Sequence, residues 1–152
     1  SKAKEAGVHT TLDTRGNPYT TKEPWHSKWL ELMKYTDLLL LDIKQVNEQE
    51  HVKLTGQTNT NILAMARELS DMGKPVWIRH VLVPGGSDKD EYLHQLADFI
   101  HTLKNVERVE VLPYHTLGIF KWEKLGIPYP LEGVKPPTQE RIDNARRILG
   151  AI

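Results

Sequence analysis

Four short apolar runs, each followed by a segment of helical periodicity, constrain the fold of this 152-residue chain more than any other feature. The runs predict β-strands because they are brief, rich in Val, Ile and Leu, and end at polar or glycine-containing segments. They lie at residues 8–13, 37–43, 76–83 and 106–112. Strands that alternate with helices favour a parallel sheet, because parallel neighbours need a crossover connection.

The segments between these runs place apolar side chains three or four residues apart, as one face of an α-helix requires. Helices are predicted at residues 23–35, 62–72 and 88–103, with a last helix that opens at residues 137–138. Ser87 is a favourable N-cap for the third of them. The predicted fold class is therefore α/β with four parallel βα units, which is half of an eight-unit barrel. An open doubly wound sheet is the alternative.

The composition excludes several classes of function. The chain has no cysteine, which excludes a disulfide, a thiolate-ligated metal and a cysteine nucleophile within it. Lys plus Arg and Asp plus Glu both number 20, so neither nucleic acid nor an anionic membrane is an expected partner. The longest apolar run, residues 38–41, is far too short to span a bilayer. We expect a cytoplasmic protein.

Polar residues gather where the predicted strands end, which is where parallel α/β proteins bind ligands. Asp42 and Lys44 stand two apart on the second strand, so both side chains point to one face. A carboxylate beside an ammonium group suits a ligand that carries hydroxyls and a carboxylate. A structural ion pair is the alternative for these two residues.

Arg79 and His115 are further candidates. Arg79 interrupts an apolar strand, so its charge needs either an anionic or polar ligand or a carboxylate on a neighbouring strand. His115 follows the fourth strand and, taken alone, is more often structural than functional. The other histidines lack metal-binding spacing. We expect convergence at one sheet edge of Asp13, Asp42, Lys44, Arg79 and His115.

Five segments, in order, carry a resemblance to a known family. They are GVHTTLDTRGN at residues 7–17, LLLLDIKQVN at 38–47, KPVWIRHVLVPGGSD at 74–88, VEVLPYHTLGIFKWEKLG at 109–126 and EGVKPPTQE at 132–140. Together they resemble the pyruvate formate-lyase activating enzymes of the radical S-adenosylmethionine superfamily. Any one segment alone would be a weak signal, but five in register over nearly the whole chain are a strong one.

The resemblance implies an oxidoreductase on a partial (β/α)6 barrel, of which residues 1–152 would be a single partial domain, the C-terminal part. Such enzymes cleave S-adenosylmethionine reductively at a four-iron, four-sulfur (4Fe-4S) cluster. The resulting 5′-deoxyadenosyl radical takes a hydrogen from a glycine of pyruvate formate-lyase. Pyruvate formate-lyase and an electron donor such as flavodoxin or ferredoxin are therefore the implied partners.

The resemblance also assigns the contacts to S-adenosylmethionine, which are Asp42, Lys44, Val81, Leu112 and His115. In that assignment, Asp42 and Lys44 contact the ribose and the carboxylate. Val81 and Leu112 form walls of the adenine pocket.

Two further sites follow from the same resemblance. Arg79 and His115 resemble residues near the glycine loop of the substrate protein. Asp13 and Thr14, with the backbone of Leu40, resemble the site of a monovalent cation.

The chain departs from the family pattern in one respect. It has neither the CxxxCxxC motif that holds the cluster nor the Gly-Gly-Glu motif that binds the amine of S-adenosylmethionine. Residues 1–5 read as the end of a helix that stops at Gly7, which suggests that the chain begins within a longer protein. We therefore expect no catalytic cluster ligand here, and an inactive chain on its own.

Three other functions remain open. The substrate could be a different glycyl radical enzyme. An aldolase-like barrel could use Lys44 as a Schiff-base amine, although the adjacent Asp42 would favour the charged amine over the neutral nucleophile. A non-catalytic module could dock on a glycyl radical enzyme.

Overall fold

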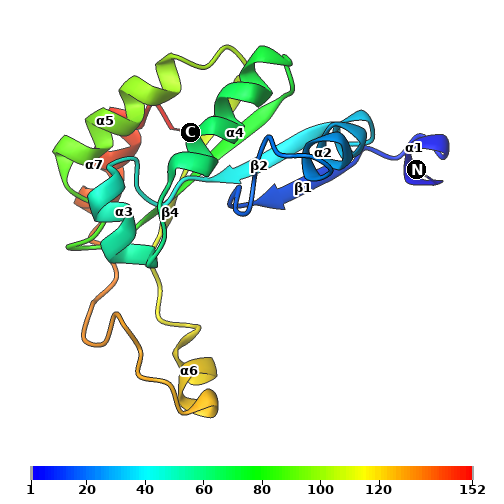
Figure 1. Ribbon diagram of the computed structural model, residues 1–152. Helices are drawn as coiled ribbons and strands as arrows, with labels where there is room; N and C mark the ends of the chain where they lie inside the picture. The colour runs from blue at the N-terminus through cyan, green and yellow to red at the C-terminus, as the bar shows by residue number, and fades with distance from the viewer. Residues whose placement is uncertain (1, 152) are drawn as a thin grey trace.

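The computed structural model describes residues 2–151, which form a four-stranded sheet with helices packed against it (Figure 1). The strands lie side by side in chain order, and each neighbouring pair is parallel. They are β1 (Thr11–Thr14), β2 (Leu38–Asp42), β3 (Val76–Leu82) and β4 (Val106–Pro113). The predicted α/β class with four parallel strands is confirmed.

Helices connect all of these strands. The helix α1 (Lys2–Glu5) precedes β1, where the end of a helix was expected. The four helices predicted from periodicity are present as α2 (Trp25–Lys34), α4 (Thr60–Asp71), α5 (Asp90–His101) and α7 (Gln139–Leu149). The predicted N-cap of α5 is wrong. The cap is Lys89, because the hydroxyl of Ser87 is used by the preceding loop.

Two helices were not predicted. The helix α3 (Glu48–Thr55) is mostly polar, so it shows no apolar stripe, but Asn47 caps its first turn and Gly56 ends it at a φ of 73°. The helix α6 (Ile119–Leu125) replaces the amphipathic loop or turn expected at residues 119–122, and it ends at Gly126 with a φ of 65°. The helix α3 therefore depends on its end residues more than on an amphipathic pattern, whereas in α6 only the C-terminal glycine is a helix-end signal.

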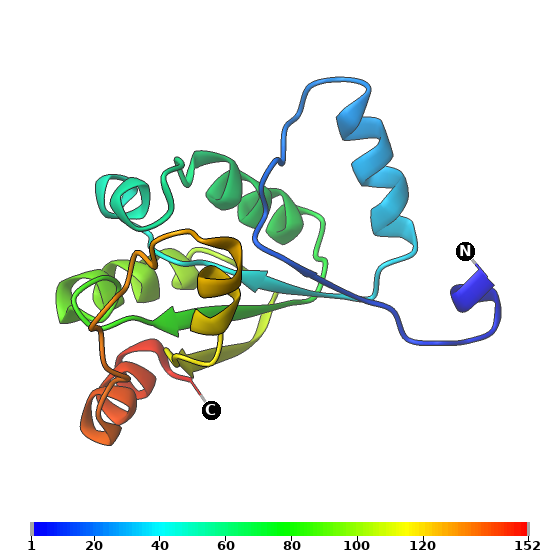
Figure 2. The same cartoon turned by 90° about the horizontal axis from the view of Figure 1, so that it is seen from below.

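The two faces of the sheet have different surroundings. Side chains of one face are buried against the helices, and Figure 2 shows α2, α3 and α4 along one side of the strands. The buried strand residues of this core are Leu39, Leu41, Val76, Ile78, Leu82, Val109 and Val111. Their neighbours along each strand are only partly buried and point to the other face. Charged strand residues can therefore be accommodated on this open face.

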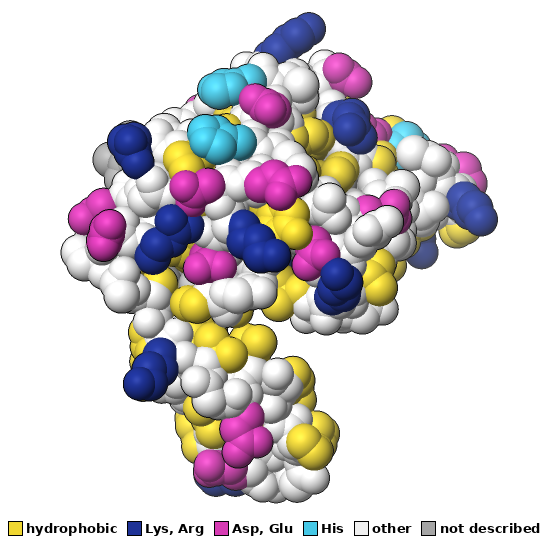
Figure 3. Space-filling model, turned by 90° about the vertical axis from the view of Figure 1, so that its left-hand side faces the viewer, with side chains coloured by type: hydrophobic (Ala, Val, Ile, Leu, Met, Phe, Trp, Pro, Cys, Tyr) yellow, Lys and Arg dark blue, Asp and Glu magenta, His cyan; other side chains and the backbone are white. Residues whose placement is uncertain are grey.

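A projecting arm, residues 116–137 with α6, extends away from the sheet (Figure 1). Its exposed apolar side chains are Leu117, Phe120, Leu125 and Ile127. Figure 3 shows hydrophobic side chains on this arm, whereas charges of both signs intermix on the body above it. A hydrogen bond of 2.8 Å between the hydroxyls of Tyr114 and Tyr129 ties the arm to the end of β4. Burial and this contact raise the pKa of Tyr129 to about 12.

Candidate ligand-binding site at the carboxyl ends of the strands

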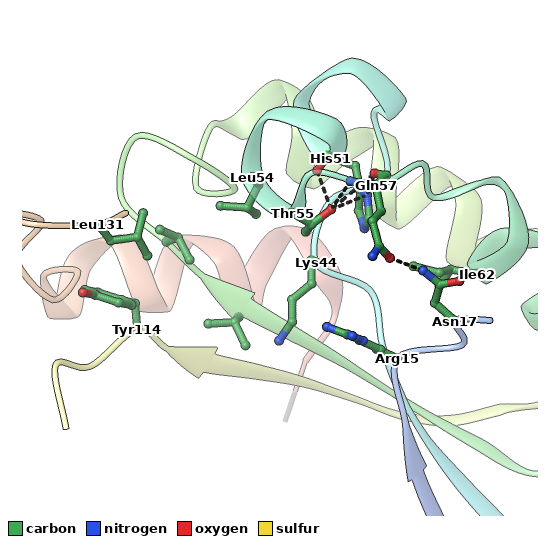
Figure 4. A pocket seen from close by; sticks show the side chains of 12 residues that line it. Arg15, Asn17, Lys44, His51, Leu54, Thr55, Gln57, Ile62, Tyr114 and Leu131 are labelled. Carbon is green, nitrogen blue, oxygen red and sulfur yellow. Dashed lines mark hydrogen bonds between the residues drawn. The ribbon is translucent and has the colours of Figure 1, made fainter. Parts of the chain in front are cut away.

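Two adjoining cavities lie at the carboxyl ends of the strands. The first has a volume of about 250 Å³ and is bordered by apolar walls and two cations, Arg15 and Lys44 (Figure 4). The second, of about 380 Å³, is bordered by Arg79, Leu112 and His115. Val81 and Tyr114 line both. The structure thus places Lys44 at the first cavity, Arg79, Leu112 and His115 at the second and Val81 at both, whereas Asp42 lines neither.

Asp42 and Lys44 form the ion pair that the sequence allowed as an alternative. The Nζ atom of Lys44 donates to Oδ2 of Asp42 at 2.6 Å, and the side chains are 31% and 19% exposed. The second carboxylate oxygen of Asp42, Oδ1, is buried and has no hydrogen-bond partner among the described residues. A buried acceptor without a donor is costly. The ion pair therefore leaves one oxygen of Asp42 unsatisfied inside the protein, and Asp42 itself lines neither cavity.

Arg79 is held by carboxylates from other strands. Its Nη1 atom donates to Oδ2 of Asp13 at 2.8 Å, and its Nε atom lies 3.7 Å from Oε2 of Glu110. Glu110 also pairs with Arg108 at 3.2 Å, whose guanidinium lies over the ring of Trp77. The sequence allowed two partners for the charge of Arg79, a ligand or a carboxylate on a neighbouring strand. The structure shows carboxylates as the partners. The same ion pairs direct its guanidinium across the open face.

The residues assigned to a monovalent cation lie close together in the sheet, but the side chains of Asp13 and Thr14 contact other protein groups. Asp13 pairs in register with Leu40, and its carboxylate is 62% exposed and bound to Arg79. The hydroxyl of Thr14 accepts a hydrogen bond from the backbone of Gly16 at 3.1 Å. Within residues 2–151, no group of three or more His, Asp or Glu side chains could hold a metal ion. The cation assignment stays a prediction that rests on the resemblance.

His115 borders the second cavity beside Leu112 and Arg79. Its side chain is exposed, at the point where the chain leaves β4 for the arm. The expected convergence of polar side chains is therefore seen in their positions at one end of the sheet.

A buried polar scaffold beneath Lys44 was not predicted. It consists of Gln45, Asn59, His80 and Ser87, all nearly inaccessible to solvent. Nδ2 of Asn59 donates to the carbonyls of Gln45 and Val46, and Nδ1 of His80 lies 2.9 Å from the carbonyl of Ile43. The hydroxyl of Ser87 donates to the carbonyl of Val81. These contacts fix the loop that carries Lys44. The one signal in the sequence was a polar residue, His80, inside an apolar strand.

We predict a pH dependence of stability that comes from His80. Burial lowers the pKa of His80 below its ordinary value of about 6.5, against an opposing effect of its contacts with Ile43 and Ser87. The unfolded chain therefore binds this proton more readily than the folded chain. The contribution to stability is complete above about pH 6.5 and is lost as the pH falls toward the lowered pKa.

Urea unfolding of the chain between pH 7.5 and pH 5 measures this effect. The free energy of unfolding should fall more steeply in the unaltered chain than in His80→Gln, which keeps a donor but does not titrate. Parallel curves for the two proteins would contradict the prediction.

Comparisons with known proteins identify close relatives. No family model matches the chain. The pyruvate formate-lyase-activating enzyme of Streptococcus mutans serotype c is 58% identical over 149 residues, which are 98% of this chain and 57% of the relative. Enzymes of the same name from Staphylococcus epidermidis and Staphylococcus aureus (strain USA300) are 54% and 51% identical, over 95% and 97% of this chain and 57% and 59% of their own lengths. The chain spans a little over half the length of these curated relatives.

Solved structures show the same fold. A domain of pyruvate-formate lyase-activating enzyme from Bacteroides vulgatus matches with a TM-score of 0.77 at 22% identity, over 98% of this chain and 80% of that chain. A radical SAM methyltransferase from Sphaerobacter thermophilus matches with a TM-score of 0.65 at 20% identity, over 95% of this chain and 39% of that chain. The four parallel βα units therefore have the arrangement found in radical SAM barrels.

Proposed function

Because this chain belongs by sequence to the family of pyruvate formate-lyase-activating enzymes, we propose that it is the C-terminal part of an enzyme that installs a glycyl radical in pyruvate formate-lyase. One observation carries the proposal beyond the likeness in sequence. Lys44 and Val81 line the cavity at the carboxyl ends of the strands, and the ammonium group of Lys44 is paired with the carboxylate of Asp42 at 2.6 Å. That pair fits the ribose hydroxyls and the carboxylate of S-adenosylmethionine.

The residues of this chain would bind and orient the cofactor and the substrate. Asp42 would accept from the ribose hydroxyls, Lys44 would donate to the carboxylate, and Val81 and Leu112 would contact the adenine. S-adenosylmethionine, when bound and cleaved with one electron from the donor protein, would release methionine and supply the 5′-deoxyadenosyl radical that takes a hydrogen atom from glycine. Arg79 and His115 border the cavity next to it, where the glycine loop of the substrate protein would enter.

The iron–sulfur cluster does not fit this chain. A 4Fe-4S cluster is held by cysteine thiolates, and the sequence has none. We propose that the cluster ligands belong to the part of the relatives' length that this chain does not span, so that residues 1–152 are a partial domain. A flavodoxin or ferredoxin as electron donor, a monovalent cation at Asp13, Thr14 and Leu40, and a cytoplasmic location complete the proposal.

The Schiff-base alternative is the weaker one. The Nζ atom of Lys44 donates a hydrogen bond to Asp42 at 2.6 Å, so it is engaged in an ion pair and is not free to attack a carbonyl.

We predict that the chain alone forms no 5′-deoxyadenosine. After anaerobic reconstitution with iron, sulfide and reductant, it should hold no stoichiometric cluster, because thiolate ligands are absent. Iron analysis and chromatography of the products measure both. A four-iron cluster on this chain, or a clear yield of 5′-deoxyadenosine, would show that the prediction is wrong.

A chimera tests the proposed function itself. The remaining residues of the Streptococcus mutans relative would be joined to this chain and incubated with pyruvate formate-lyase, S-adenosylmethionine and reduced flavodoxin. We expect the electron paramagnetic resonance signal of a glycyl radical on pyruvate formate-lyase. Formation of 5′-deoxyadenosine without that signal would point to a different substrate protein, and no product at all would contradict the proposal.

A further inference from the structure

The cavity bordered by Lys44 has a second cation at its mouth. Arg15 directly follows β1, and Lys44 lies two residues past the end of β2, the neighbouring parallel strand. Figure 4 shows the two side chains extending toward one another at the open side of the cavity. The resemblance in sequence assigns no role to Arg15.

The position of Arg15 is fixed by its neighbours. Gly16 has a φ of 73°, and a Cβ atom there would lie 3.3 Å from the Cα atom of Ile62, so this turn is packed against α4. The side chain of Asn17 donates to that of Gln57, which ties the loop to the segment between α3 and α4. Arg15 therefore extends from a loop that is anchored on both sides.

The charges around the cavity are unbalanced. Lys44 is paired with Asp42, whereas Arg15 has no ion pair with any residue in the described range 2–151. No Asp or Glu side chain lines the cavity. Arg15 and Lys44 thus give this cavity two cationic side chains beside apolar walls such as Leu54 and Leu131, with one carboxylate, that of Asp42, paired to Lys44. An anion bound there would give Arg15 the acceptor that it lacks among the described residues.

We propose that Arg15 and Lys44 together bind the carboxylate of a nucleoside-linked amino acid, with the guanidinium of Arg15 providing the second arm of the clamp. The inference rests on the proposed function, in which that ligand is S-adenosylmethionine. A guanidinium donates two parallel hydrogen bonds to a carboxylate, and an ammonium group donates from a single point. The clamp directs the nucleoside toward Val81, which both cavities share.

Calorimetric titration of this chain with two ligands tests the clamp. S-adenosylmethionine carries the carboxylate, and 5′-methylthioadenosine keeps the nucleoside and the sulfur but has no amino-acid group. Arg15→Gln should weaken S-adenosylmethionine binding roughly tenfold and leave 5′-methylthioadenosine binding unchanged. Lys28→Gln, which removes a charge from an exposed site on α2, should change neither.

The outcomes separate this inference from the proposed function. No loss in Arg15→Gln, or an equal loss for both ligands, would overturn the clamp even where the chain binds S-adenosylmethionine. Should the unaltered chain bind neither nucleoside, this cavity alone is not the cofactor site, and inorganic phosphate then tests the two cations. Phosphate binding that Arg15→Gln weakens supports the anion clamp, and absence of phosphate binding overturns it.

Discussion

Lys44→Ala should weaken the binding of S-adenosylmethionine by roughly tenfold to hundredfold and leave the melting temperature nearly unchanged. The lost contact to the ligand is a charge-assisted hydrogen bond, which is about twice as strong as a neutral one. The lost contact within the protein is the ion pair to Asp42, whose side chains are 31% and 19% exposed. We expect its cost to lie nearer the roughly 0–1 kcal/mol of a surface pair than the roughly 3–5 kcal/mol of a buried pair that loses one partner. The two costs therefore appear in different measurements.

Asp42→Asn complements this change because it keeps the shape of the side chain and removes its charge. The amide has one acceptor oxygen instead of two, so it cannot serve Lys44 and a ribose hydroxyl equally well. We expect a loss of affinity in the same range as for Lys44→Ala, again with a small change in melting temperature. A buried structural bridge would behave differently, since removal of one partner typically costs about 3–5 kcal/mol of stability.

A matched ion pair on α3 provides the control. The Nζ atom of Lys53 lies 2.6 Å from Glu50, the same separation as between Lys44 and Asp42, but on an exposed surface. Lys53→Ala should alter neither affinity nor melting temperature. All variants are compared by calorimetry in a longer, cysteine-containing protein that includes this chain. A collapsed melting temperature with normal affinity in the folded fraction would show that Asp42 and Lys44 are structural.

The strands and most helices could be predicted because each depends on a local pattern. Runs such as residues 38–41 are apolar on both sides, and the helices α4 and α5 bury regular stripes, so neighbouring residues alone determine the pattern. The helix α3 is mostly polar, and its ends define it more than its interior does. The helix α6 has only seven residues, so its pattern covers about two turns. End effects of this kind are difficult to read from one sequence.

The site was predictable only in part, for a different reason. Asp42 and Lys44 are only two residues apart in sequence. Because side chains alternate between the two faces of an extended strand, residues two apart lie on the same face. The contact of Arg79 with Asp13 joins strands that are separated by β2, and the approach of Arg15 to Lys44 depends on the register of β1 and β2. Such pairs depend on the order and register of the strands, whereas the sequence pattern predicts only the fold class.

The buried polar scaffold holds the loop that carries Lys44, and Asn59 makes two of its hydrogen bonds. Asn59 is 2% exposed and is the N-cap residue of α4, yet its side chain makes no capping bond. Instead, Nδ2 donates to the carbonyl of Gln45 at 3.1 Å and to that of Val46 at 2.6 Å. The segment that follows Lys44 thus depends on a single amide group for two of its carbonyls.

Asn59→Ala should therefore destabilise the chain by about 2–4 kcal/mol, because each buried carbonyl left without a donor costs about 1–3 kcal/mol. Asn59→Asp should cost at least as much, since it presents a carboxylate to the same two carbonyls. Asn61→Ala is the control. Asn61 lies two residues after Asn59, in the first turn of α4, and its side chain is exposed, so the substitution should change stability by less than about 0.5 kcal/mol. Urea unfolding at pH 7.5 measures all three. Equal stability of Asn59→Ala and Asn61→Ala would mean that water replaces the amide, and that the loop carrying Lys44 is held by other contacts.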